Sequence, residues 1–197
     1  MSKRREVGGP ADDDDLRVVR RDSLLVLRLH DREVEVLQWV FADLARLIGE
    51  GSGTDVVTER LFPRAYLDPT EESAESQWQS LVRGDLVEAR LSALSAVVLG
   101  LDAAAPAAGR DAMREVVLDD ARAEQWLGIL NDARLALGTA LDVTADTDVD
   151  ALEPDDPRRE GYVVYDWLTH LLGALLGSVS EPRVGEGEGE DEADVDG

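Results

Sequence analysis

Residues 31–48 read DREVEVLQWVFADLARLI, and the fold class follows from this pattern. Its apolar side chains recur at alternating spacings of three and four residues, at Val34, Leu37, Phe41, Leu44 and Ile48. That period places them on one face of an α-helix. Asp31 is typical of the residue that caps the start of a helix, and the glycines that follow the stretch are typical of its end. We therefore expect an amphipathic helix that packs one face into a core.

Four further segments predict helices by the same criteria, over residues 69–84, 85–100, 119–141 and 162–178. The first follows Asp68, a capping residue with a proline after it at the first helical position. Gly84 separates that helix from the next one, which Asp85 caps. The polar residues 51–60 predict a loop, and residues 61–67 predict an apolar connector.

Two short apolar runs, residues 23–29 and 115–118, have the length and composition of β-strands. We expect them to pair with each other, because pairing covers their exposed edges. Asp119 or Asp120, directly after the second run, caps the helix that follows. The predicted fold is mainly α: a single helical-bundle domain of about five helices with a minimal two-strand β pairing.

Charge is distributed unevenly over the 197 residues, whose formal net charge is −23. Residues 1–21 predict a disordered arm and residues 179–197 a disordered acidic tail, because neither holds enough apolar surface to offset its chain entropy. The domain between them, residues 22–178, contains an acidic loop over residues 142–156 with seven acidic side chains and no basic one. Such charge favours solubility, and it also suits a surface that binds a basic protein.

The residue inventory leaves little basis for catalysis. Cysteine is absent, the only lysine is Lys3, and the only histidines are His30 and His170. Thiolate zinc sites, cysteine nucleophiles and a P-loop are therefore excluded, and no serine-histidine triad is indicated. The alternating aspartates of the acidic loop lack the glycine and the glutamate of a calcium site. We expect no catalytic residue, no cofactor and no metal.

The same inventory bears on nucleic acids and membranes. Because the net charge is strongly negative and no predicted helix has a basic face, we do not expect direct nucleic-acid binding. No apolar run reaches the roughly 18 residues that cross a bilayer. We expect a cytoplasmic protein without membrane contact. The sequence does not decide whether it forms a homo-oligomer. His170 follows Asp166 by four residues on the last predicted helix, where the two side chains can pair.

Residues 126–139, WLGILNDARLALGT, are the most unusual stretch of the chain. Asn131, Arg134 and Gly138 fall on one face of the predicted helix. A glycine inside a helix costs about 1 kcal/mol relative to alanine, so a reason for its presence is expected. We favour close helix–helix packing, with Asn131 and Arg134 satisfying polar groups across the contact. A binding surface is the alternative.

The chain resembles an actinobacterial family, the AosR oxidative-stress transcriptional regulators, formerly a family of unknown function. The resemblance spans about residues 22–177 and rests on four segments in order: 60–66 (RLFPRAY), 84–86 (GDL), 126–139 and 165–169 (YDWLT). It implies action in transcription through contact with a sigma factor or RNA polymerase. It also suggests four partner-binding residues: Asn131, Asp132, Arg134 and Trp167.

This chain cannot sense oxidants through thiols, because a chain without cysteine cannot form a disulfide switch. The expected function is non-enzymatic regulation through protein–protein contact, in which the acidic surface meets a basic patch on the partner. The alternatives are an adaptor or structural interaction protein in proteolysis or metabolism, and an uncharacterised enzyme.

Overall fold

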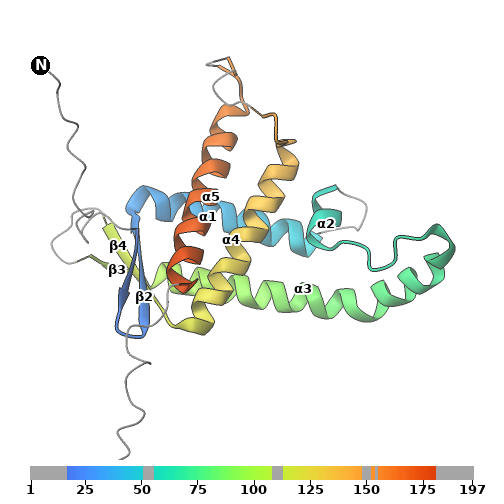
Figure 1. Cartoon of the computed structure of the whole chain (residues 1–197), viewed down its shortest axis with the longest axis horizontal. Helices are drawn as coiled ribbons and strands as arrows, with labels where there is room; N and C mark the ends of the chain where they lie inside the picture. Colours follow the sequence, from blue (N-terminus) through green and yellow to red (C-terminus); the bar gives the residue numbers. More distant parts are fainter. Residues whose placement is uncertain (1–16, 51–55, 108–112, 148–151, 154, 181–197) are drawn as a thin grey trace, which may run out of the picture.

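The computed structural model describes residues 17–50, 56–107, 113–147, 152–153 and 155–180. The elements in chain order are strands β1 (Val18–Arg21) and β2 (Leu24–His30), helices α1 (Asp31–Glu50) and α2 (Val56–Leu61), a 3-10 turn (Pro69–Glu71), helix α3 (Glu72–Asp102), strands β3 (Ala105–Pro106) and β4 (Met113–Leu118), and helices α4 (Asp120–Ala140) and α5 (Arg159–Ser180). Helices α1 and α3 run along the long axis, α4 and α5 cross them side by side, and the sheet lies at one end (Figure 1). The predicted mainly α fold with about five helices is confirmed.

The sheet is larger than the sequence predicts. The expected pairing is confirmed, since β2 and β4 are antiparallel neighbours over six residue pairs. However, the sheet has four strands in the order β1-β2-β4-β3, so the minimal two-strand pairing is wrong. β1 comes from the predicted arm 1–21, and its four residues are too few to show a strand pattern beside charged neighbours. The turn into β2 places Asp22 at a φ of 54°, which aspartate tolerates better than most residues.

Several predicted segments lie outside the described residues in whole or in part. Residues 1–16 of the predicted arm and residues 181–197 of the predicted tail are not described. The acidic loop is described except for residues 148–151 and 154. Ser180 ends α5, so the last helix extends slightly into the predicted tail.

Two helices differ from the prediction. α3 continues through Gly84, where the sequence predicts a break, because glycine ends a helix only where the backbone turns left-handed and Gly84 stays helical. α2 begins within the predicted loop 51–60 and ends one residue after it. With six residues, this helix is too short to show a helical period in the sequence. Asp68 acts as a cap, since its carboxylate accepts a hydrogen bond from the Thr70 N–H at 2.8 Å, but it caps the 3-10 turn ahead of α3.

The start of α1 is also capped differently. Asp31 is already helical, and its carboxylate accepts a 2.7 Å hydrogen bond from Arg114 of β4. The His30 N–H instead donates to the Glu33 carboxylate at 2.8 Å, which is one half of a capping box. At α4 the prediction is confirmed, because Asp119 accepts from the Arg122 N–H at 2.8 Å.

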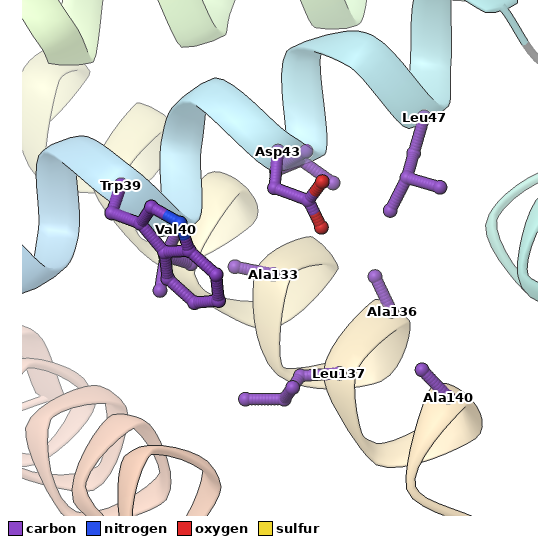
Figure 2. A pocket seen from close by; sticks show the side chains of 9 residues that line it. Trp39, Val40, Asp43, Leu47, Ala133, Ala136, Leu137 and Ala140 are labelled. Atoms are coloured by element: carbon purple, nitrogen blue, oxygen red, sulfur yellow. The ribbon is translucent and has the colours of Figure 1, made fainter. Parts of the chain in front are cut away.

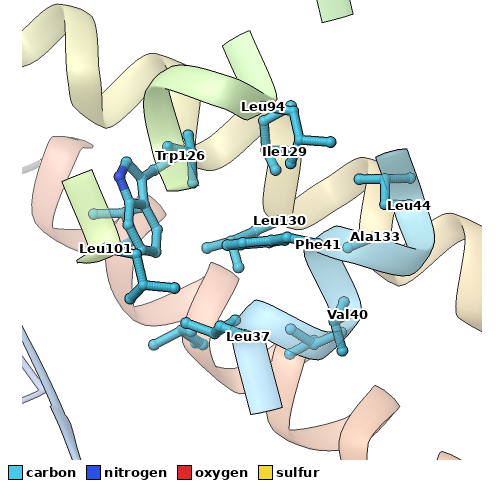
Figure 3. Packing of buried hydrophobic residues seen from close by; sticks show 14 of the residues in the cluster. Leu37, Val40, Phe41, Leu44, Leu94, Leu101, Trp126, Ile129, Leu130 and Ala133 are labelled. Carbon is cyan, nitrogen blue, oxygen red and sulfur yellow. The ribbon is translucent and has the colours of Figure 1, made fainter. Parts of the chain in front are cut away.

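The core joins the sheet to the helices. Phe41 of α1 and Trp126 of α4 meet edge to face at its centre, with ring centroids 6.1 Å apart (Figure 3). The other largest buried side chains are leucines from β2, β4 and all four long helices: Leu27, Leu29, Leu37, Leu44, Leu101, Leu118, Leu130, Leu168, Leu171 and Leu175. One continuous core therefore holds the strands and helices together as a single unit.

The first and last elements of the described chain are joined directly. Strand β1 packs against α5, and the Arg20 guanidinium donates a 2.6 Å hydrogen bond to the Ser178 carbonyl. That carbonyl is in the last turn of α5, where backbone acceptors have no partner within the helix. Arg20 thus fastens the N-terminal strand to the end of the final helix.

Gly138 lies in the contact between α4 and α5. A Cβ added there would lie 2.8 Å from a ring carbon of Tyr165, so the aromatic ring occupies the space that a side chain would need. The close packing expected at this glycine is confirmed, but in the described contacts Asn131 accepts a hydrogen bond from Arg134 of its own helix and not from α5. Arg134, one turn earlier, lies in the same contact and is 3.4 Å from the Tyr165 hydroxyl.

Gly138→Ala is expected to lower the free energy of unfolding by about 1–3 kcal/mol, because the new methyl group forces Tyr165 or the helix backbone to move. Urea unfolding followed by circular dichroism measures this. Gly128→Ala is the matched control: it lies on the same helix with nothing within 4 Å, so it should be neutral or stabilising by up to about 1 kcal/mol. Equal behaviour of the two variants would contradict the packing role of Gly138.

Candidate functional site

A groove runs between the N-terminal halves of α1 and α5 and reaches the end of α4. It consists of two adjoining cavities of about 650 and 740 Å³, which share Arg32, Val36, Glu160 and Val164. The first cavity extends to Trp39 and to the end of α4, and the second extends to Trp167 and the start of α1. We call the two cavities together the α1–α5 groove.

The groove is apolar, and two of its apolar side chains are unusually exposed. Trp39 is 64% exposed and Val163 is 59% exposed, although both types of side chain are normally buried. A smaller hollow continues past Trp39 between α1 and α4, where Ala133 faces the indole and Ala136 lies further along, toward Asp43 and Leu47 (Figure 2). The groove therefore offers apolar surface that the fold itself leaves uncovered.

Trp167 is held in place by Glu33. The indole N–H donates to the Glu33 carboxylate at 3.1 Å, and the same carboxylate accepts from the Arg17 guanidinium at 2.6 Å and from the His30 N–H. Burial raises the pKa of Glu33, but the hydrogen bonds from Arg17 and from the His30 N–H, together with the positive charge of Arg17, outweigh burial and hold that pKa below its ordinary value. Glu33 therefore stays ionised at neutral pH and fixes the indole at one end of the groove.

The edge of the groove is predominantly acidic. Glu35 on α1 and Glu160 on α5 line it and form no ion pair with any described residue. Asp31 and Glu33 also line it but are paired with arginines, and Arg32 supplies the one guanidinium among the described lining residues. Leu141 and Pro157, the residues on either side of the acidic stretch 142–156 in the sequence, both line it. The groove thus combines an apolar floor with acidic side chains along its edge.

The four residues suggested as partner-binding do not come together. Trp167 lies in the α1–α5 groove. Arg134 lies in the α4–α5 contact, where its guanidinium is 3.4 Å from the Tyr165 hydroxyl. It also donates a 3.4 Å hydrogen bond to the side-chain amide oxygen of Asn131 on its own helix. Asp132 faces a different neighbour, α3. The four residues therefore lie at different contacts, and Trp167 is the one that lines the groove. Their role in partner binding stays a prediction.

Asp132 belongs to a structural cluster. The Arg90 guanidinium of α3 lies 3.1 Å from its carboxylate, donates to the Leu61 carbonyl at 3.2 Å, and stands 4.6 Å from the centre of the Phe62 ring. Burial raises the pKa of Asp132, and the neighbouring Arg90 opposes that rise only in part. The cluster fastens the end of α2 to α3 and α4, which accounts for Leu61 and Phe62 in the 60–66 segment.

Sequence reasoning missed Trp39, Glu33 and Glu160 as parts of a site. Trp39 lies outside the apolar stripe of α1 that begins at Val34, so a large aromatic off the stripe was the available signal. Glu33 follows His30 by three residues at a helix start, which is the spacing of a capping box. Glu160 carries no sequence signal beyond its charge, because its place depends on how α5 crosses α1.

The residues that the structure describes also bear on metal binding and on membrane crossing. They contain no cluster of three or more acidic or histidine side chains able to hold a metal ion. Within the same ranges, no helix is long and apolar enough to cross a bilayer. His170 is exposed, with Nδ1 2.8 Å from the Asp166 carbonyl oxygen and 3.4 Å from its carboxylate, which is the pairing that its spacing predicts.

Comparison with known proteins identifies the family of the chain. Residues 14–179 match a family described as a domain of unknown function, DUF2017. No curated protein and no solved structure matches the chain. The match covers every described helix and strand except the last residue of α5.

Proposed function

The chain belongs to the DUF2017 family, and from this premise we propose that it is a non-enzymatic regulator that acts by binding another protein through the α1–α5 groove. The observation that carries the proposal is an exposed tryptophan, Trp39, in an apolar groove with acidic edges. Tryptophan is enriched among the residues that dominate binding energy at protein interfaces. Exposed apolar surface with a polar edge is the usual anatomy of such interfaces.

The resemblance to the AosR regulators supports a more specific form of the proposal. In that form the partner is a sigma factor or a subunit of RNA polymerase, and the process is the response to oxidative stress. One of the residues that the resemblance points to, Trp167, lines the groove. Since cysteine is absent, peroxide should leave partner binding unchanged, and the chain acts as a binding protein rather than a thiol sensor.

The test is a pull-down from the native host with the tagged chain, with and without peroxide, washed at low and high salt. We expect a sigma factor or polymerase subunit to be recovered equally with and without peroxide and to be lost at high salt. The variant Trp39→Ala/Val163→Glu should lose that recovery. Leu81→Glu on α3, which changes a side chain that is 68% exposed outside the groove, should keep it.

Each contrary result has a defined meaning. Recovery of only proteases or metabolic enzymes through the groove would replace the transcriptional role with the adaptor role. Recovery of a polymerase subunit that survives in the groove variant would place the binding surface elsewhere and overturn the role of the groove.

A further inference from the structure

We propose that the α1–α5 groove binds a basic amphipathic helix of the partner protein, with apolar side chains on the floor of the groove and cationic ones facing Glu35 and Glu160. This inference rests on the proposed function and names the chemistry of the partner. Three properties of the groove argue for it: the arrangement of the apolar surface, the unpaired carboxylates and the charge of the whole chain.

The apolar surface suits a helix rather than a small ligand. Trp39 and Trp167 lie in different cavities of the groove, and Val36 and Val164 continue the apolar floor between them. A helix that lies in a groove between two others presents apolar anchors at spacings of three, four and seven residues. Apolar anchors along one face of such a helix would fill both cavities.

The unpaired carboxylates determine the charge of the occupant. Glu35 projects from α1 and Glu160 from α5, so they come from the two helices that form the groove, and both are exposed. Asp31 and Glu33 are already neutralised by Arg114 and Arg17. Cationic side chains on the bound helix would pair with Glu35 and Glu160, which form no ion pair with another described residue.

Other occupants conflict with the same charges. The phosphates of nucleic acids and the headgroups of anionic membranes would be repelled by a chain of net charge −23. A second copy of the chain brings that same negative charge to the contact. A positively charged segment of a different protein is the occupant that the groove attracts.

The test uses the full chain and three fluorescein-labelled synthetic peptides of 18 residues, a length chosen to give about five helical turns. The first carries leucines at helical spacing and arginines elsewhere, the second replaces the arginines with glutamates, and the third is a scrambled form of the first. Fluorescence anisotropy should show micromolar binding of the first peptide alone, weakening with added salt. Binding of the acidic peptide at equal strength would overturn the proposal.

Matched variants separate the groove from general attraction to an acidic protein. Glu35→Gln/Glu160→Gln should weaken binding of the basic peptide by about 3- to 10-fold. Glu88→Gln/Glu124→Gln removes the same charge from exposed positions on α3 and α4, and should change binding less than 2-fold. Trp39→Ala should weaken it about 10-fold or more. Equal weakening by the two double variants would show that the peptide binds without using the groove.

The outcomes also separate this inference from the proposed function. If the pull-down depends on the groove but the basic peptide does not bind, the regulator stands and the helical basic occupant is wrong. If the basic peptide binds in the groove but no sigma factor or polymerase subunit is recovered, the occupant is right and the transcriptional role is wrong.

Discussion

Trp126→Ala is expected to lower the free energy of unfolding by about 3–5 kcal/mol, because it removes the largest side chain in the core. Trp126 is 2% exposed and packs edge to face against Phe41, with Leu101 of α3 and Leu130 of its own helix beside it (Figure 3). The cavity left behind would border three helices, which are held by many other contacts and can collapse only in part. Domains of this size are stable by about 5–15 kcal/mol, so the loss is a large share.

Urea unfolding measured by far-ultraviolet circular dichroism tests this, since that signal does not depend on tryptophan fluorescence. Trp39→Ala is the matched control, because the same truncation at a 64% exposed position should change stability by less than about 0.5 kcal/mol. The two variants should therefore separate stability from binding: the first unfolds easily, and the second folds normally but loses the partner. Similar losses of stability in both would show that Trp39 is not a free surface residue.

Arg90→Ala is expected to lower the free energy of unfolding by about 2–4 kcal/mol at pH 7. It removes the ion pair with Asp132, the hydrogen bond to the Leu61 carbonyl and the cation–π contact with Phe62. The largest part of the cost comes from Asp132, which stays in a site that is 14% exposed and loses its counterion. Urea unfolding at a series of pH values measures the effect.

The loss should become smaller as the pH falls. Burial already raises the pKa of Asp132, and without Arg90 that pKa rises further. The folded variant then binds a proton at a pH where the unfolded chain, with an ordinary aspartate pKa of about 3.9, does not. Lowering the pH through the folded-state pKa therefore recovers the part of the stability lost to the uncompensated charge, and the recovery is complete below the unfolded-state pKa.

Two controls sharpen this result. Arg46→Ala removes an exposed guanidinium that pairs with Asp43 and Glu50, so it should lower stability far less than Arg90→Ala and leave no comparable pH dependence. Arg90→Ala/Asp132→Asn should be more stable at pH 7 than Arg90→Ala alone, because the second change removes the unpaired charge. A double variant less stable than the single one would assign the cost to lost packing by Arg90 instead of charge.

The sequence predicts the long elements well because each carries a repeated signal. The stripe of α1 extends over several turns, and the β2 and β4 runs are apolar enough to indicate paired strands. The short elements β1 and α2 carry no period, and their stability comes from contacts that form only in the folded chain. At Gly84 the sequence predicts a helix end that the structure does not have, because glycine, which often ends helices, is tolerated inside a long one.

The site was predictable only in part, for a related reason. Gly138 was interpretable as a close contact because a glycine inside a helix has a cost that packing must offset. The partner-binding set was assembled from segments of a resemblance, and the structure separates it into two packing clusters and one groove residue, Trp167. The groove itself depends on the angle at which α5 crosses α1, which no local pattern encodes.

The hydrogen bond from Arg20 to the Ser178 carbonyl has a consequence for synthesis in the cell. The first strand can complete its contacts only when the last helix has left the ribosome, and α5 also supplies Leu168, Leu171 and Leu175 to the core. At about 5–20 residues per second, the nascent chain spends several seconds with those leucines missing. During that time the apolar faces of α1 and α4 that α5 covers are exposed to solvent. Nascent chains arrested before residue 159 should therefore bind ribosome-associated chaperones more strongly than chains arrested with α5 outside the ribosome.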